Sequence, residues 1–162
     1  MKSSNKAVRD AFTSVINALG YQTYPNGTTI DAYPFVMLGE QTEVQAGDQG
    51  SFGQITTINI MVVDGWSKYG DRTRGDAMTD AITQAILTKP HSLQIVGFDM
   101  PSLVLDNIMT STEKTSTHTI QTTAMRFKMQ LFEQAAAVTL NPIMDENSNN
   151  ILDEFYNIIY EN

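Results

Sequence analysis

The residues best suited to chemistry lie late in the sequence, where oxygen-bearing side chains recur at every second position. Positions 1, 3, 5 and 9 of a calcium-binding loop pattern are filled by Asp145, Asn147, Asn149 and Asp153. Position 6, however, is Asn150 instead of glycine, and position 12 is Tyr156, which offers no bidentate carboxylate. The calcium loop is therefore incomplete, and a solvated acidic linker is the simpler interpretation of this segment.

The remaining residues show no pattern typical of catalysis. His91 and His118 are the only histidines, and neither belongs to a Ser-His-Asp or His-x-x-x-His arrangement. The sequence has no cysteine, which excludes thiol catalysis, disulfides and cysteine-based metal sites. We therefore predict that the chain is not an enzyme and uses no cofactor.

Composition narrows the classes of partner. The chain has 162 residues, of which 18 are acidic and 10 are basic, so its formal net charge is −8. Binding to nucleic acid through counterion release needs clustered Lys and Arg, which this balance disfavours. No apolar run approaches the roughly 20 residues of a membrane-spanning helix. The first residues lack the apolar stretch of a signal peptide, so no membrane partner is expected.

Two amphipathic helices are predicted. The first, at 5–19, has apolar residues at helical spacing: Val8, Ala11, Phe12, Val15, Ile16 and Leu19. The second begins at Thr73, which is spaced from Asp76 as in a capping box, and ends before Lys89 and Pro90. Both helices would bury one apolar stripe.

Strands are predicted at 35–38, 55–66, 93–98, 103–109 and 118–132. The clearest are 55–66 and 118–132, where apolar residues occupy alternate positions. The segment 39–54 lacks periodicity and is predicted to be a long mobile loop, and 110–117 is predicted to be a polar connection. The expected order is one helix, two strands, one helix and three strands.

This order predicts an α+β fold, with a mostly antiparallel sheet and two helices packed on one face. Residues 1–134 form the predicted domain, and 135–162 form an acidic linker with a short C-terminal appendage helix. The apolar residues of that helix are Ile151, Leu152, Phe155, Ile158 and Ile159. Its apolar stripe must be covered, either by the chain's own core or by an adjacent subunit.

Several local strings resemble a known family. They are the run Tyr-Pro-Phe-Val-Met-Leu-Gly-Glu at 33–40, the strand that ends in Asp-Gly-Trp-Ser-Lys-Tyr-Gly at 64–70, and the helix that carries Ala77, Asp80, Ala81, Ile82 and Leu87. Together with the first helix and the late hairpin, they resemble the tail-completion proteins of long-tailed bacteriophages, also called tail terminators or tail-to-head joining proteins. The resemblance covers about residues 5–133.

The resemblance implies a structural virion protein. Such subunits form an oligomeric ring, typically a hexamer, that caps the head-proximal end of the tail tube and joins the tail to a connector or stopper protein. DNA passes through the lumen without sequence-specific binding, and weakly repulsive acidic walls would let it slide. The implied location is the virion tail or neck, and the host cytoplasm during assembly. Alternatives are another neck or tail-tube component, a small-molecule or peptide-binding domain, or a hydrolase with an unrecognised site.

Candidate interface residues come from the segments expected to reach a neighbour. They are Glu43 and Asp48 in the predicted loop, Arg72 and Arg74 beside the second helix, Glu113 and Lys114 in the polar connection, and Phe155 and Ile159 in the tail. Glu43 and Asp48 are also candidates for the lumen wall. The alternative for the loop is an ordinary mobile surface segment.

Overall fold

The computed structural model describes residues 3–28, 30, 32–46, 53–67, 70, 72–88 and 93–134. The elements follow the order α1 (Asn5–Ala18), β1 (Thr23–Pro25), β2 (Phe35–Ala46), β3 (Gly53–Trp66), α2 (Thr73–Leu87), β4 (Phe98–Lys114) and β5 (Thr119–Glu133). No helix within these residues is long and apolar enough to span a membrane.

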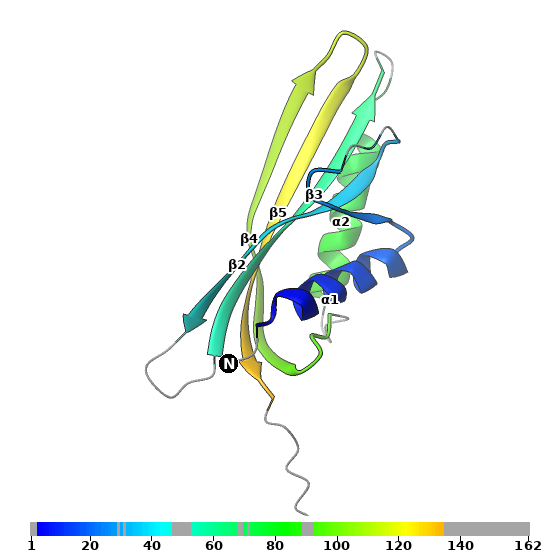
Figure 1. The fold of residues 1–162 in the computed structure, drawn as a ribbon. Helices are drawn as coiled ribbons and strands as arrows, with labels where there is room; N and C mark the ends of the chain where they lie inside the picture. The colour runs from blue at the N-terminus through cyan, green and yellow to red at the C-terminus, as the bar shows by residue number, and fades with distance from the viewer. Residues whose placement is uncertain are drawn as a thin grey trace, which may run out of the picture.

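The strands form one sheet in the order β1-β2-β3-β5-β4. Three neighbouring pairs are antiparallel, and the short β1 runs parallel to β2. Both helices lie on the same side of the sheet (Figure 1). The α+β architecture expected from the sequence, with two helices on one face of a mostly antiparallel sheet, is confirmed.

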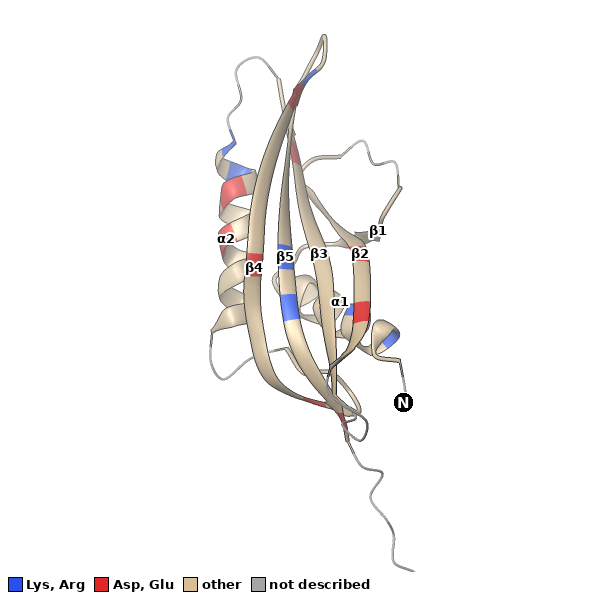
Figure 2. Ribbon diagram, turned by 90° about the vertical axis from the view of Figure 1, so that its left-hand side faces the viewer, with Lys and Arg blue, Asp and Glu red and all other residues tan. Residues whose placement is uncertain are grey.

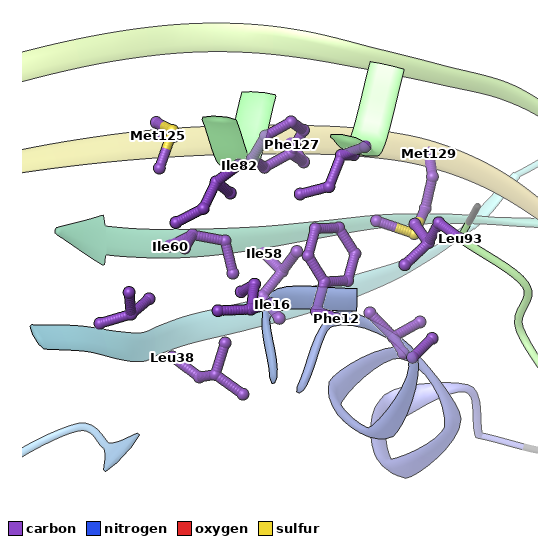
Figure 3. Close-up of a cluster of buried hydrophobic side chains, with 14 of the residues drawn as sticks. Phe12, Ile16, Leu38, Ile58, Ile60, Ile82, Leu93, Met125, Phe127 and Met129 are labelled. Atoms are coloured by element: carbon purple, nitrogen blue, oxygen red, sulfur yellow. The ribbon is translucent and has the colours of Figure 1, made fainter. Parts of the chain in front are cut away.

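The core lies between the helices and the sheet, because each helix turns its apolar stripe toward the strands. Val8, Phe12 and Ile16 on α1 are fully buried, and so are Ile82 and Ile86 on α2. They belong to one cluster with the inward side chains of β3 and β5. Figure 3 shows Phe12, Ile16 and Ile82 in this cluster. The rings of Phe12 and Phe127 lie 5.5 Å apart in a tilted arrangement. Burial of each such side chain contributes about 1.5–3 kcal/mol.

The predicted loop at 39–54 is wrong for most of its length. β2 continues to Ala46 and pairs with β3 from Phe35 to the Ala46–Gly53 pair. A register shift between Leu38 and Gln41 interrupts the ladder. The segment escaped recognition because its residues are polar on both faces of the strand, so no hydrophobic alternation marks it.

The late hairpin is also longer than predicted. Residues 93–97 are not a strand, and β4 runs from Phe98 to Lys114, with register shifts against β5 between Asp99 and Ser102 and between Leu105 and Asn107. The predicted polar connection at 110–117 is wrong, because Thr110 to Lys114 pair with β5. The true turn lies at 115–118, where the Thr115 backbone N–H donates to the His118 carbonyl at 2.8 Å. Figure 1 shows this hairpin extending past α2.

Candidate assembly surfaces

The junction between β3 and α2 is built around one buried carboxylate. Asp64 is 1% exposed, and its Oδ2 accepts the backbone N–H of Gly75 at 3.0 Å. Its Oδ1 accepts the backbone N–H of Gly65 at 2.8 Å and an Nη2–H of Arg74 at 3.0 Å. Burial of a carboxylate is unfavourable unless hydrogen bonds compensate, and these three donors do so.

This junction corrects the predicted capping box. The N-cap residue of α2 is Arg72, and no side chain caps the helix from that position. The Gly75 N–H, in the first turn, is instead satisfied by Asp64 from the neighbouring strand. A Cβ atom at Gly75 would lie 3.0 Å from the Asp64 Cβ, so a residue without a side chain permits this close approach. Asp64 therefore fixes the start of α2 against the end of β3.

Four of the predicted interface residues lie at the same end of the sheet as this junction. Arg72 forms an ion pair with Asp76 at 3.2 Å, and Arg74 forms the ion pair with Asp64. Glu113 and Lys114 are exposed at the end of β4. Gln121 of β5 links the hairpin to α2 by donating from Nε2 to Asp76 Oδ1 at 3.1 Å. Both arginines thus already have partners within the chain, whereas the described residues show none for Glu113 or Lys114.

The other predicted residues lie elsewhere. Glu43, on β2 near the opposite end of the sheet, accepts a hydrogen bond from Ser3 Oγ at 3.1 Å. Asp48, Phe155 and Ile159 lie outside the described residues, as do the calcium-loop candidates Asp145, Asn147, Asn149 and Asp153. Within the described ranges, no group of three or more His, Cys, Asp or Glu side chains could hold a metal ion.

The edge formed by β4 is a surface that sequence reasoning missed. β4 has 17 residues and is the last strand of the sheet within the described part of the chain. Its side chains are exposed from Asp106 to Lys114, and they include Ile108 at 46% and Met109 at 66%. An edge strand presents free backbone N–H and C=O groups, which can pair with another strand. Its Ile, Val and Thr residues were a β-propensity signal that could have revealed it.

The side of the sheet away from α1 and α2, which we call the open face, was also missed. It is formed by Ile55 and Met61 on β3, Ala124, Arg126 and Lys128 on β5, and Val104 and Met109 on β4. Figure 2 shows the two basic positions of β5 near the middle of the strand. Toward the end of β3, Tyr33 covers this face by packing against Gly65 and stacking on Phe35. The central part has no such cover among the described residues.

We compared the sequence with protein-family models and with proteins of known function. No family model matches the chain. In sequence, the chain is 28% identical over 92 residues to the Tail completion protein gp17 of Bacillus phage SPP1, a match that covers 56% of this chain and 64% of that protein. The resemblance to tail completion proteins is confirmed. The match spans less than two-thirds of that relative's length.

Two solved structures are similar to the chain. One chain in the virion of a native gene transfer agent particle is 15% identical and superposes with a TM-score of 0.51, covering 79% of this chain and 92% of that chain. The structure of bacteriophage SPP1 gp17 protein is 20% identical with a TM-score of 0.42, covering 82% of this chain and 93% of that chain. The first of these likenesses shows that the fold also occurs in a virion particle.

Proposed function

We propose that this chain is a structural subunit of a phage tail that acts in tail completion and is not an enzyme. The observation that carries the proposal is the 92-residue match to the SPP1 tail completion protein. The absence of a catalytic pattern in the sequence agrees with a structural role. So does the organisation of the fold, which within the described residues has a long strand edge and a sheet face that no helix covers, because such surfaces suit contacts between proteins.

We propose further that the subunits assemble into a closed ring, in which the β4 edge of one subunit contacts the neighbouring subunit. A head-to-tail contact between non-identical surfaces gives a closed ring when the rotation fits. The β4 edge supports this role because it is long, exposed and apolar at Ile108 and Met109. The exposed Glu113 and Lys114 lie at the end of the same edge, where they can select the correct neighbour.

We further infer that the ring caps the head-proximal end of the tail tube and contacts the tube protein on one side and a connector or stopper protein on the other. DNA would then pass through the lumen during ejection. The net charge of −8 supports this passage, because an acidic wall repels the DNA backbone weakly, whereas many basic contacts would retain it.

The test is to add the purified chain to polymerising tail-tube subunits and to image the products by negative stain. Light scattering of the free chain gives its native mass in parallel. The proposal expects closed rings that sit at tube ends and stop elongation. Incorporation along the tube would instead identify a tube component, and a chain that never associates with tubes would overturn the assembly role.

The ring contact itself can be tested by proline substitutions at two neighbouring positions of β4, Ser111→Pro and Thr112→Pro. Adjacent residues of a strand point their N–H groups in opposite directions, so one substitution removes a hydrogen bond to β5 and the other removes a donor from the free edge. The substitution at the free edge should leave the unfolding free energy unchanged, and we expect that variant to lose ring formation. Rings that persist in both variants would exclude the β4 edge as the contact.

A further inference from the structure

The open face has an unusual chemical character for a chain that is acidic overall. Arg126 and Lys128 occupy its centre and are exposed, although the chain carries only 10 basic residues against 18 acidic ones. Met61 and Met109 line the hollow beside Arg126 together with Glu40, and Val104 lies with Asp106 in the hollow beside Lys128. Met109, on the same face, is 66% exposed. The exposed Lys128 and these apolar side chains fit a partner segment that offers both a carboxylate and an apolar stripe.

The charges of this face are only partly satisfied by the described residues. Arg126 Nε lies 3.6 Å from Asp106 Oδ2, and both side chains are about half exposed, so this pair is weak. The side chain of Lys128 forms no ion pair or hydrogen bond within the described part of the chain. The face therefore retains at least one basic group available for a carboxylate.

The chain itself contains a segment with the matching chemistry. Residues 135–162 include five acidic residues and no Lys or Arg. If 151–162 form the helix that their spacing predicts, Ile151, Phe155 and Ile158 lie on one apolar stripe. Glu154 and Glu161, seven residues apart, then lie together beside that stripe, about 10 Å from each other along the helix axis. Arg126 and Lys128 are separated by about 7 Å along β5 and point to the same side of the sheet.

The length of the intervening chain favours the segment's own sheet over that of a second copy. Arg126 lies about 26 Å along β5 from Gln134, at 3.3 Å per residue. A random-coil chain of sixteen residues, the length of 135–150, would have a root-mean-square span of about 22 Å. Because this span would match the separation, a tail joined by such a chain would have an effective concentration at its own open face on the order of millimolar.

We propose that residues 151–162 bind the open face of the sheet in their own chain. The apolar stripe covers Met61, Val104 and Met109, while Glu154 and Glu161 face Lys128 and Arg126. The segment then shields the exposed apolar side chains and Lys128 on the open face of the free subunit. This assignment goes beyond the proposed tail-completion role and does not depend on it, because the test below uses the isolated chain and requires neither a ring nor a tube.

The test uses the absence of cysteine from the sequence. Asn157→Cys gives the full chain one thiol, on the polar side of the predicted helix, for attachment of a nitroxide spin label. Methionine methyl groups labelled with ¹³C report where the spin label lies, because line broadening falls steeply with distance. Met61 and Met109 report on the open face, while Met78 and Met125 report on the helix-covered core.

The expected result is that the Met61 and Met109 signals lose most of their intensity while the Met78 and Met125 signals lose little. Broadening of neither open-face methionine, or equal broadening of all four, would overturn the proposal. A mixture of spin-labelled chains without ¹³C and ¹³C-labelled chains without a spin label must show no broadening at low concentration. Broadening in that mixture would assign the tail to the open face of a second copy and would overturn docking onto its own chain.

Charge reversal tests the role of the basic pair. Arg126→Glu with Lys128→Glu should abolish the selective broadening, and adding Glu154→Lys with Glu161→Lys should restore it. The matched control is Lys6→Glu with Lys114→Glu, an equal charge change at exposed positions away from the centre of the face, and it should leave the broadening unchanged. Unshifted signals of the buried Met125 and Met129 verify folding in each variant. Broadening that survives reversal of Arg126 and Lys128 would exclude the assigned ion pairs.

Discussion

The two faces of β5 differ sharply although they belong to one strand. Met125, Phe127, Met129 and Leu131 face the helices and are at most 1% exposed. Arg126 and Lys128, at the alternate positions, point to the open face and are exposed. Because successive side chains of a strand point to opposite faces, a single strand can join a hydrophobic core to a potential binding surface. Stability and association are therefore expected to depend on alternate residues of the same strand.

The largest expected effect is a difference in unfolding free energy between substitutions at two adjacent residues of β5, one on each face. Phe127→Ala removes a fully buried ring that packs against Phe12, and we expect the free energy of unfolding to fall by about 3–5 kcal/mol. Lys128→Ala, the matched control on the other face, should change it by less than about 0.5 kcal/mol. Urea denaturation of both variants measures the difference. Similar losses at the two positions would contradict the assignment of the faces.

A second prediction concerns the polar end of the helix-covered face. Asp64→Ala leaves the buried N–H groups of Gly65 and Gly75 without their acceptor, and each loss is expected to destabilise the fold by about 1–3 kcal/mol. Asp64→Asn should be milder, because its amide oxygen still accepts one N–H. Urea denaturation gives the stability, and faster amide exchange at Gly75 would locate the change at the start of α2.

The control for Asp64 is Asp10→Ala, which removes an exposed carboxylate paired with Lys6 on α1. Exposed pairs of this spacing contribute about 0.3–0.5 kcal/mol. An equal effect of the two substitutions would show that the buried network does not hold the junction.

A third prediction tests the covered part of the open face. A Cβ at residue 65 would lie 2.6 Å from the ring of Tyr33, closer than atoms normally approach. Gly65→Ala should therefore displace the ring and destabilise the protein by about 1–3 kcal/mol, with a lower melting temperature in a thermal scan. In a Tyr33→Ala background the same substitution should have a smaller effect, because the clash is gone. Additive effects would place the cause elsewhere.

The sequence predicted those helices and strands whose apolar residues recur at regular spacing. α1 and α2 were located within a residue or two, and the alternation of β3 and β5 was identified, because each of these elements buries one face. The second half of β2 and the end of β4 were missed for the complementary reason. Residues such as Thr42, Glu43 and Ser111 belong to strands that lie at or near the edge of the sheet, where neither face needs to be apolar.

The candidate surfaces were harder to predict than the elements. The contact between Asp64 and Gly75 joins residues eleven positions apart across a turn, and nothing local to Asp64 distinguishes it from other strand residues. The open face combines side chains from three strands, so Met61, Arg126 and Met109 become neighbours only after the sheet order is known. Arg126 and Lys128 were visible as the polar side of a strand, but their position on a face that no described helix covers was not.

The smallest expected effect concerns how much an ion pair on the open face contributes to the stability of the fold. Arg126 and Asp106 form an ion pair whose side chains are 50% and 42% exposed, so solvent screens their attraction. In a double-mutant cycle of Arg126→Ala and Asp106→Ala, we expect a coupling of about 0.2–1 kcal/mol at low salt that shrinks in high salt. Urea denaturation at two salt concentrations measures it. A larger, salt-insensitive coupling would mean that the pair is shielded from solvent, and the division between a folding face and a binding face of β5 would then fail at its centre.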